Sequence, residues 1–318
     1  MERLRRVVPG EAAGFRRVRA GRGFRFLRDD GTDATPREKR RIRALAVPPA
    51  WTDVWIAVDP RAHIQAVGTD DAGRRQYLYH PRWRERRDRR KFVRALALAE
   101  ALPAARARIT RALRGGDEGE RVRAAAVRML DDAALRIGSE RYRVRYGSRG
   151  LTTLRRRDVR VDGADISLSF PAKSGKRASV EITDPDLAEV LRDLANGPAR
   201  TPLLARRRGR RRVRLTEAEV NAYIRTVTGG RFTAKDFRTL RATILAARSL
   251  AETGPAGSEP ARRRAERVAV QVTADALGNT PAVARSSYID PRVFRRYAQG
   301  RLLDLSVSPE TAIRELLS

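Results

Sequence analysis

The chain has 318 residues and no cysteine, which excludes disulfides, thiolate metal sites and a cysteine nucleophile, and it is long enough for two ordinary domains. Its 69 Lys and Arg residues against 38 Asp and Glu residues leave a net charge of +31, which favours a polyanionic partner, with nucleic acid the first candidate and an anionic membrane surface the alternative. No apolar run approaches the ~18 residues of a membrane span and the N-terminus lacks a signal-peptide core, so we expect a cytoplasmic protein. Its positive charge suits a nucleoid-associated protein.

The first part of the chain has strand character. Residues 1–82 alternate short apolar and aromatic runs with Gly, Pro and Asp turns, as in GFRRVRAGRGFRFLRDDG. From Trp83 onward the spacing becomes helical, so we predict a β-rich domain over residues 1–89 and a second domain over residues 90–318. The charge run WRERRDRRK near this boundary fits either a solvated, DNA-facing linker or the first turns of a helix.

The second part is mainly helical. Its periodicity predicts helices over residues 119–138, 185–196, 216–227, 234–252 and 261–277. One island of strand pattern, residues 151–183, contains turns at Asp162–Gly163 and at residues 173–176, which predicts three short antiparallel strands. Residues 206–214 and 252–264 have the composition of exposed loops.

Several catalytic plans lack the residues that they need. There is no Walker A loop, and the two histidines, His63 and His80, give little material for a metal site or a Ser-His-Asp triad. The adjacent pair Asp131–Asp132 points in different directions on a helix, and such pairs more often cap turns or pair with arginine than bind two metals. We therefore expect no cofactor, no metal and no nucleotide.

What remains is a spaced set of cations, an amide and a tyrosine. The segments that carry it are LRIG with Arg136, AKSG with Lys173, KDFRT with Arg238, GNTP with Asn279 and SSYI with Tyr288. This ordered set resembles the active site of the type IB DNA topoisomerases, in particular the poxvirus-like group that is also found in bacteria. That family has an Arg in IRxG, a Lys in a hairpin turn, an Arg in KDxRT, a His in GHTP and a Tyr nine residues later. The likeness extends from about residue 20 to residue 290 and includes GTDDAGRRQYLYH and GLTTLRRRDV.

The resemblance implies a reaction and a role for each residue. Tyr288 would attack a phosphodiester to give a 3'-phosphotyrosine, and the freed 5'-hydroxyl would later attack in return. Arg136 and Arg238 suit the stabilisation of charge on the non-bridging oxygens, because guanidinium offers paired N–H groups and stays charged. Lys173 is implied to protonate the departing 5'-oxygen. Asn279 departs from the His of the better-known pattern, and it can donate a hydrogen bond but carries no charge.

The N-terminal motif implies contacts with duplex DNA. In QYLY, Tyr77 and Tyr79 are two residues apart and so share one face of a strand, with Gln76 on the other. The tyrosines could be a core-facing pair; the resemblance instead implies DNA contacts by Gln76 at a base edge, by both tyrosines, and by Arg74, Arg75 and Tyr142. Ser139 stands where poxviral members have a Lys, so their pentapyrimidine preference is not carried over.

The fold class that follows is α+β. We expect a bilobal DNA clamp with a small β-rich N-terminal lobe and a mainly α-helical catalytic lobe, topoisomerase- and tyrosine-recombinase-like, that carries a three-stranded antiparallel sheet. A monomer would relax positive and negative supercoils, with a flexible hinge near residues 80–90. Two alternatives remain: a tyrosine recombinase, whose second arginine normally sits in HxxR rather than in KDFR, and a non-enzymatic basic protein that coats DNA.

Overall fold

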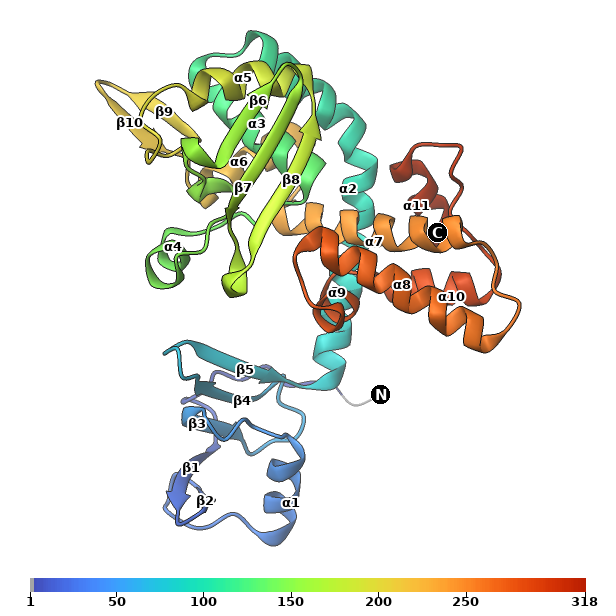
Figure 1. The fold of residues 1–318 in the computed structure, drawn as a ribbon. Coiled ribbons are helices and arrows are strands. Elements are labelled where there is room, and N and C mark those ends of the chain that lie inside the picture. The colour runs from blue at the N-terminus through green and yellow to red at the C-terminus, as the bar shows by residue number, and fades with distance from the viewer. Residues whose placement is uncertain (1–2) are drawn as a thin grey trace. The chain divides into compact units, whose positions relative to one another are not determined.

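The computed structural model describes residues 3–318, except for the side chains of Tyr142 and Ser174. The chain forms two compact units, residues 1–90 and residues 91–318 (Figure 1). In the described part of the chain, no helix is both long enough and apolar enough to cross a membrane.

The first unit is built on a five-stranded antiparallel sheet. The strand order is β2-β1-β3-β4-β5, formed by β1 (Gly14–Ala20), β2 (Gly23–Leu27), β3 (Thr52–Ala57), β4 (Ile64–Thr69) and β5 (Arg75–Tyr79). One face of the sheet buries Phe15, Phe26, Val54 and Ile56 against a helix, α1 (Pro36–Ala44), whose Ile42 completes this small core. Burial of these apolar side chains is the main source of stability for so small a unit.

Helix α1 was not among the expected elements. Its start follows from local chemistry, because the Thr35 side chain accepts a hydrogen bond from the Glu38 N–H and the Glu38 carboxylate accepts one from the Thr35 N–H. Pro36 occupies the first turn, where its missing N–H costs nothing. The T-P-R-E sequence is therefore the signal that could have predicted this helix.

The basic run at the domain boundary is helical. It forms the first turns of α2 (Pro81–Gly115), so of the two alternatives the helix is correct and the linker is wrong. Residues 81–90 of this helix belong to the first unit and residues 91–115 to the second.

The second unit contains the three predicted antiparallel strands. They are β6 (Val159–Asp162), β7 (Asp165–Pro171) and β8 (Arg177–Thr183), in the order β6-β7-β8. The β7–β8 turn is a short 3₁₀ segment, Lys173–Gly175, at the end of a long hairpin (Figure 1). The expectation of a loop over residues 206–214 is wrong, because β9 (Ala205–Arg208) and β10 (Arg211–Arg214) pair as a two-stranded hairpin.

Helices make up the rest of the second unit. They are α3 (Glu118–Ala133), α4 (Glu140–Tyr146), α5 (Pro185–Ala195), α6 (Glu217–Thr228), α7 (Ala234–Thr253), α8 (Glu259–Leu277), α9 (Pro281–Ser287), α10 (Pro291–Ala298) and α11 (Pro309–Leu317). Helix α3 is the centre of the core: its Val122, Ala125, Met129 and Leu130 are buried, and it packs against α5, α6 and α7. The long loop expected over residues 252–264 is also wrong, because α7 continues to Thr253 and Ser258 already caps α8.

Candidate active site

The Arg136 segment is held by a close approach of two backbone stretches. Beyond α3, the carbonyl of Arg136 accepts a hydrogen bond from Leu151 N (2.9 Å), and the carbonyl of Ile137 accepts one from Thr152 N (2.9 Å). Gly138 has a left-handed φ of +76°, and a Cβ on Gly150 would lie 2.5 Å from the Arg136 carbonyl oxygen. Only glycine fits at either position, so the LRIG and RGLTT segments fix the place of Arg136 together.

Arg238 lies in the second turn of α7 and is 5% exposed. Its Nη1 donates to the Ala134 carbonyl, and its Nη2 donates to the Leu277 carbonyl at 3.0 Å. These carbonyls lie at the C-terminal ends of α3 and α8, where the helix dipole is negative and favours a cation. Burial lowers the pKa of the Arg238 guanidinium, and Arg136 adds to this while Tyr288 opposes it.

The end of α8 positions Asn279. Gly278 takes a left-handed φ of +57°, and Asn279 N donates to the Ala274 carbonyl at 2.8 Å, which is a Schellman ending. Arg136 Nη2 then donates both to the Gly278 carbonyl, at 2.8 Å, and to Asn279 Oδ1. The α8 terminus therefore accepts hydrogen bonds from both candidate arginines.

Two buried donors in this region are unpaired. Asn279 Nδ2 and Arg238 Nε have no hydrogen-bond partner among the described residues. A buried donor without a partner costs roughly 1–3 kcal/mol, so such groups commonly await a ligand. Both residues line one cavity of about 380 Å³.

Lys173 lines the same cavity. It is exposed at the tip of the β7–β8 hairpin, where Ala172 N donates to the Lys176 carbonyl at 2.7 Å. Arg136, Lys173, Arg238 and Asn279 all line the 380 Å³ cavity. Arg136 and Lys173 also line an adjoining cavity of about 310 Å³. Four cationic or donor side chains from four separate segments thus converge.

Tyr288 stands next to this group. It follows the short helix α9, which begins at Pro281, and its N donates to the Ala284 carbonyl at 3.0 Å. The half-buried ring lies under Arg238, whose Cζ is 5.2 Å from the ring centroid. Thr243 Oγ1 donates to the Tyr288 carbonyl at 3.3 Å and accepts from Asp290 N at 3.2 Å, which fixes the backbone on the C-terminal side of α9. The five candidate residues therefore form one site within the second unit.

Two further residues support the site and were not singled out in the sequence. Asp236 is fully buried, accepts from Thr233 N at 2.8 Å to cap α7, and pairs with Arg94 Nε at 2.7 Å. It holds the turn that carries Arg238, and the T-A-K-D capping box was its signal. Arg149 lines both cavities and is ion-paired with Asp158. Nothing in so arginine-rich a sequence marks Arg149 out.

The N-terminal candidates lie on β5 and the turn before it. The rings of Tyr77 and Tyr79 stack with centroids 6.0 Å apart, so they share one face as predicted. Tyr77 is 40% exposed, which argues against a core-facing pair. Asp70 accepts from Gln76 Nε2 at 2.8 Å and from Arg74 Nε at 2.7 Å, and these bonds fix both side chains. Arg75 is exposed, and the Tyr142 side chain lies outside the described residues.

The chain belongs to the type IB DNA topoisomerases. Residues 80–300, more than half of the chain, match the family model described as eukaryotic DNA topoisomerase I, catalytic core. Residues 23–70 match the bacterial DNA topoisomerase IB, N-terminal domain. The DNA topoisomerase 1B of Acanthamoeba polyphaga mimivirus is 30% identical over 274 residues, which cover 82% of this chain and 80% of the relative. The prediction of a DNA-acting type IB topoisomerase is therefore confirmed.

Proposed function

We propose that this topoisomerase relaxes positive and negative supercoils by cutting and resealing one DNA strand through a 3'-phosphotyrosine at Tyr288. The observation that carries the proposal is the convergence of Arg136, Lys173, Arg238 and Asn279 on one cavity, with the Tyr288 ring against Arg238. No other tyrosine among the described residues has this surrounding of cations.

In the cleavage step, Tyr288 Oη attacks the scissile phosphorus and the bond between phosphorus and the 5'-oxygen breaks. The tyrosine proton leaves to water, and the Lys173 ammonium gives its proton to the departing 5'-oxygen. Religation runs in reverse, because the 5'-hydroxyl attacks the phosphotyrosine and Tyr288 leaves. The phosphotyrosine conserves the bond energy, so the cycle needs no external energy source.

The two arginines act on the charge of the transition state. Negative charge accumulates on the non-bridging oxygens, and donors already in place stabilise it without reorganisation. Arg238 uses one N–H of Nη1 and one of Nη2 to hold its carbonyl partners, and its Nε is unpaired, so the guanidinium keeps N–H groups that can serve a phosphate oxygen. Arg136 is anchored through Nη2 alone.

Asn279 supplies a neutral donor at the place of the family histidine. Because its Oδ1 accepts from Arg136, the amide keeps Nδ2 as its donor, and Nδ2 is the unpaired group. Lys173 differs from the other candidate residues of this site because it lies on a hairpin tip rather than at a helix end. We assign to Lys173 the transfer of the proton, which is the step that suits a mobile side chain.

The first unit would supply DNA contacts that position the duplex. The exposed Tyr77–Tyr79 face suits backbone contacts, and Gln76, fixed by Asp70, suits a base edge in the major groove. We propose that a monomer closes on DNA as a bilobal clamp, with the second unit as a catalytic lobe of the kind that tyrosine recombinases share, and that it uses neither nucleotide nor metal.

A plasmid relaxation assay in EDTA, without ATP, tests the proposal. The parent should relax both negatively and positively supercoiled plasmid that carries no special site, and Tyr288→Phe should form no denaturation-resistant protein–DNA adduct. Tyr297→Phe is the matched control, because Tyr297 is a buried tyrosine whose hydroxyl donates to the Gly254 carbonyl at 2.9 Å. An adduct in Tyr288→Phe would refute the nucleophile, and dependence on a defined DNA site would favour a recombinase.

A further inference from the structure

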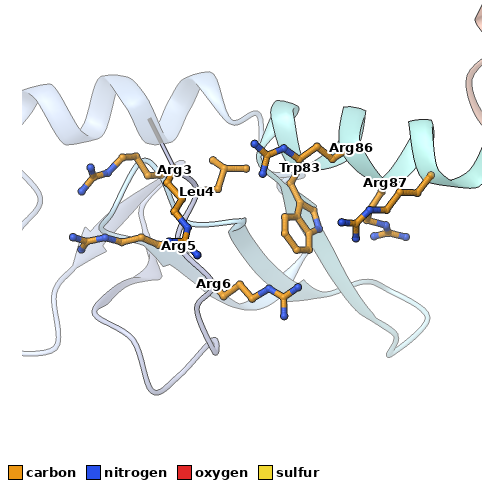
Figure 2. A pocket seen from close by; sticks show the side chains of 9 residues that line it. Arg3, Leu4, Arg5, Arg6, Trp83, Arg86 and Arg87 are labelled. Atoms are coloured by element: carbon orange, nitrogen blue, oxygen red, sulfur yellow. The ribbon is translucent and has the colours of Figure 1, made fainter. Parts of the chain in front are cut away.

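The first unit contains a second basic site that the topoisomerase chemistry does not use. It is a cavity of about 780 Å³, lined by nine residues of which seven are arginines. Three come from the N-terminal segment and three from the first turns of α2: Arg3, Arg5, Arg6, Arg86, Arg87 and Arg90. We call these residues, with Arg61 and Trp83, the arginine pocket. Figure 2 shows Trp83 between the N-terminal segment and the α2 arginines.

The α2 side of the arginine pocket follows from helical spacing. Residues 83, 86, 87 and 90 are spaced i, i+3, i+4 and i+7, so they lie on one face of α2. Seven positive charges around one hollow repel each other, and folding alone gives no reason to gather them.

The other side is fixed by backbone hydrogen bonds. Arg5 N donates to the Arg61 carbonyl at 2.9 Å, and His63 N donates to the Arg5 carbonyl at 2.8 Å, so the N-terminal segment runs beside residues 61–63. The His63 ring contacts the Trp83 ring edge-on, with centroids 4.6 Å apart, and the Arg6 guanidinium lies 5.6 Å from the Trp83 ring. The pocket is therefore built into the fold of the first unit.

The charge of the pocket is only partly neutralised. Asp59 lies 3.5 Å from Arg5 and 3.6 Å from Arg61. From residue 3 onward, no described carboxylate is ion-paired with the α2 arginines of the pocket, and none of the described lining residues is acidic. A volume of ~300–1,000 Å³ is typical of ligand sites, and arginine favours phosphate because its N–H groups match two phosphate oxygens.

One contact joins the arginine pocket to the Tyr77–Tyr79 face. The Arg87 guanidinium lies 5.0 Å from the Tyr79 ring centroid, and Tyr79 stacks on Tyr77. Arg87 thus links the aromatic pair on β5 to the basic side chains of the pocket. Such interleaving is typical of surfaces that follow a nucleic-acid backbone.

We propose that the arginine pocket binds backbone phosphates of DNA that extends beyond the Tyr77–Tyr79 face. The proposal rests on the DNA-contacting role proposed above for that face. It lengthens the DNA stretch that the first unit holds, and it makes affinity more dependent on salt than the catalytic site alone would.

The test compares triple variants in the full chain. Arg86→Gln/Arg87→Gln/Arg90→Gln removes the α2 side, and Arg3→Gln/Arg5→Gln/Arg6→Gln removes the N-terminal side. The matched control, Arg37→Gln/Arg40→Gln/Arg43→Gln, removes the same charge from exposed positions on α1 of the same unit. Duplex DNA binding is measured against salt in the Tyr288→Phe background, so that covalent adducts do not form.

Each phosphate contact contributes about 0.9 to the slope of log K against log salt. Each pocket variant should lower the slope by about 2 and weaken binding about tenfold or more, whereas the α1 control should change the slope by less than about 1. Equal slopes in the pocket variants and the control would overturn the proposal. If a triple variant misfolds, phenylglyoxal modification of arginines in the parent provides the test. DNA should protect Arg86, Arg87 and Arg90 from modification but not Arg37, Arg40 and Arg43. Equal protection of the two sets by DNA would overturn the proposal.

Two further arms separate other outcomes. Tripolyphosphate is the probe for a free anion. If it quenches Trp83 fluorescence while the slope of log K against log salt for DNA binding is equal in all variants, the pocket holds a free polyphosphate. The proposal that the pocket binds DNA phosphates would then be wrong. Tyr77→Ala and Tyr79→Ala test the face on which the proposal rests. If they leave DNA binding unchanged while the pocket variants weaken it, the proposed role of the face fails and the pocket stands. Adduct formation by the parent reports the Tyr288 chemistry independently of both.

Discussion

Asn279→Asp should separate stability from catalysis. The substitution preserves shape and keeps an oxygen for Arg136 Nη2, but it replaces the unpaired Nδ2 donor by a second acceptor that carries charge. In the free protein, this exchanges a buried donor without a partner for a buried carboxylate oxygen, and we expect the charge pair of that carboxylate with Arg136 to outweigh the cost of burying it. We expect the free energy of unfolding to rise by about 1 kcal/mol, which raises Tm by about 2–4 °C in a unit of this size.

For catalysis the same change should be severe. Loss of one oxyanion donor costs about 10²–10³ in rate, and a carboxylate facing the phosphate adds repulsion, so single-turnover cleavage should fall by about 10³ or more. The control is Asn221→Asp, the same substitution at a residue whose Oδ1 accepts from Ala234 N at the start of α7, and it should cleave like the parent.

Rapid-quench measurement of the covalent adduct and calorimetry of the free protein are the two assays. Cleavage within about tenfold of the parent would show that the amide does not donate to the phosphate. A fall in Tm would show that the Arg136–Asn279 contact is not as described. Asn279→His tests the family alternative, and a several-fold drop in rate would refute the idea that histidine is the better donor in this context.

Three other outcomes are expected. Lys173→Ala should slow cleavage by about 10²–10⁴, which is the range for a general acid. A substrate whose 5'-oxygen is replaced by sulfur should restore most of the rate, because sulfur leaves without protonation. Lys176→Ala on the same hairpin tip is the control, and failure of the sulfur substrate to restore the rate would exclude the acid role. Arg238→Lys keeps the charge but cannot donate to the Ala134 and Leu277 carbonyls and to phosphate together, so cleavage should fall about 10²-fold; the exposed Arg241→Lys on the same helix should have no effect, and equal rates for the two variants would contradict the geometry. Burial, with the neighbouring Asp131 carboxylate, raises the pKa of Asp132 to about 6, so the folded state holds that proton more tightly than the unfolded chain and stability falls as pH rises from about 4 to 6. In urea unfolding, Asp132→Asn should therefore stabilise the protein by about 2 kcal/mol at pH 7.5 and have no effect below pH 4. The control Asp131→Asn breaks a 2.6 Å ion pair with Arg106 and should destabilise the protein at pH 7.5. Equal gains in stability at both pH values for Asp132→Asn would refute this reasoning.

The sequence singles out the candidate site residues because each of them lies in a short local motif. The turn residues at 162–163 and 173–176 specify the hairpin that carries Lys173, and Pro281 specifies the helix before Tyr288. What the motifs do not contain is long-range geometry. Arg238 is held by the carbonyls of Ala134 and Leu277, and Arg136 is held by the carbonyl of Gly278. These carbonyls are far away in the chain from the arginines that they hold.

The missed elements have specific physical causes. The β9–β10 hairpin is almost all arginine, with Val213 its one apolar outer residue, so no burial pattern marks its strands, and only the turn at Gly209 with φ +61° is typical of a hairpin. Helix α1 buries a single residue, Ile42, and therefore lacks an apolar stripe. The arginine pocket requires the N-terminal segment to lie beside residues 61–63, which no local pattern indicates.

The hairpin tip has a practical consequence for chemical labelling. Of the 69 basic residues only five are lysines, and two of these, Lys173 and Lys176, are exposed together on the β7–β8 turn. An amine-selective reagent therefore finds very few targets in this protein, although it is crowded with positive charge. Labelling at these two positions, read by mass spectrometry with and without DNA, reports the approach of the hairpin to its substrate in the unaltered protein.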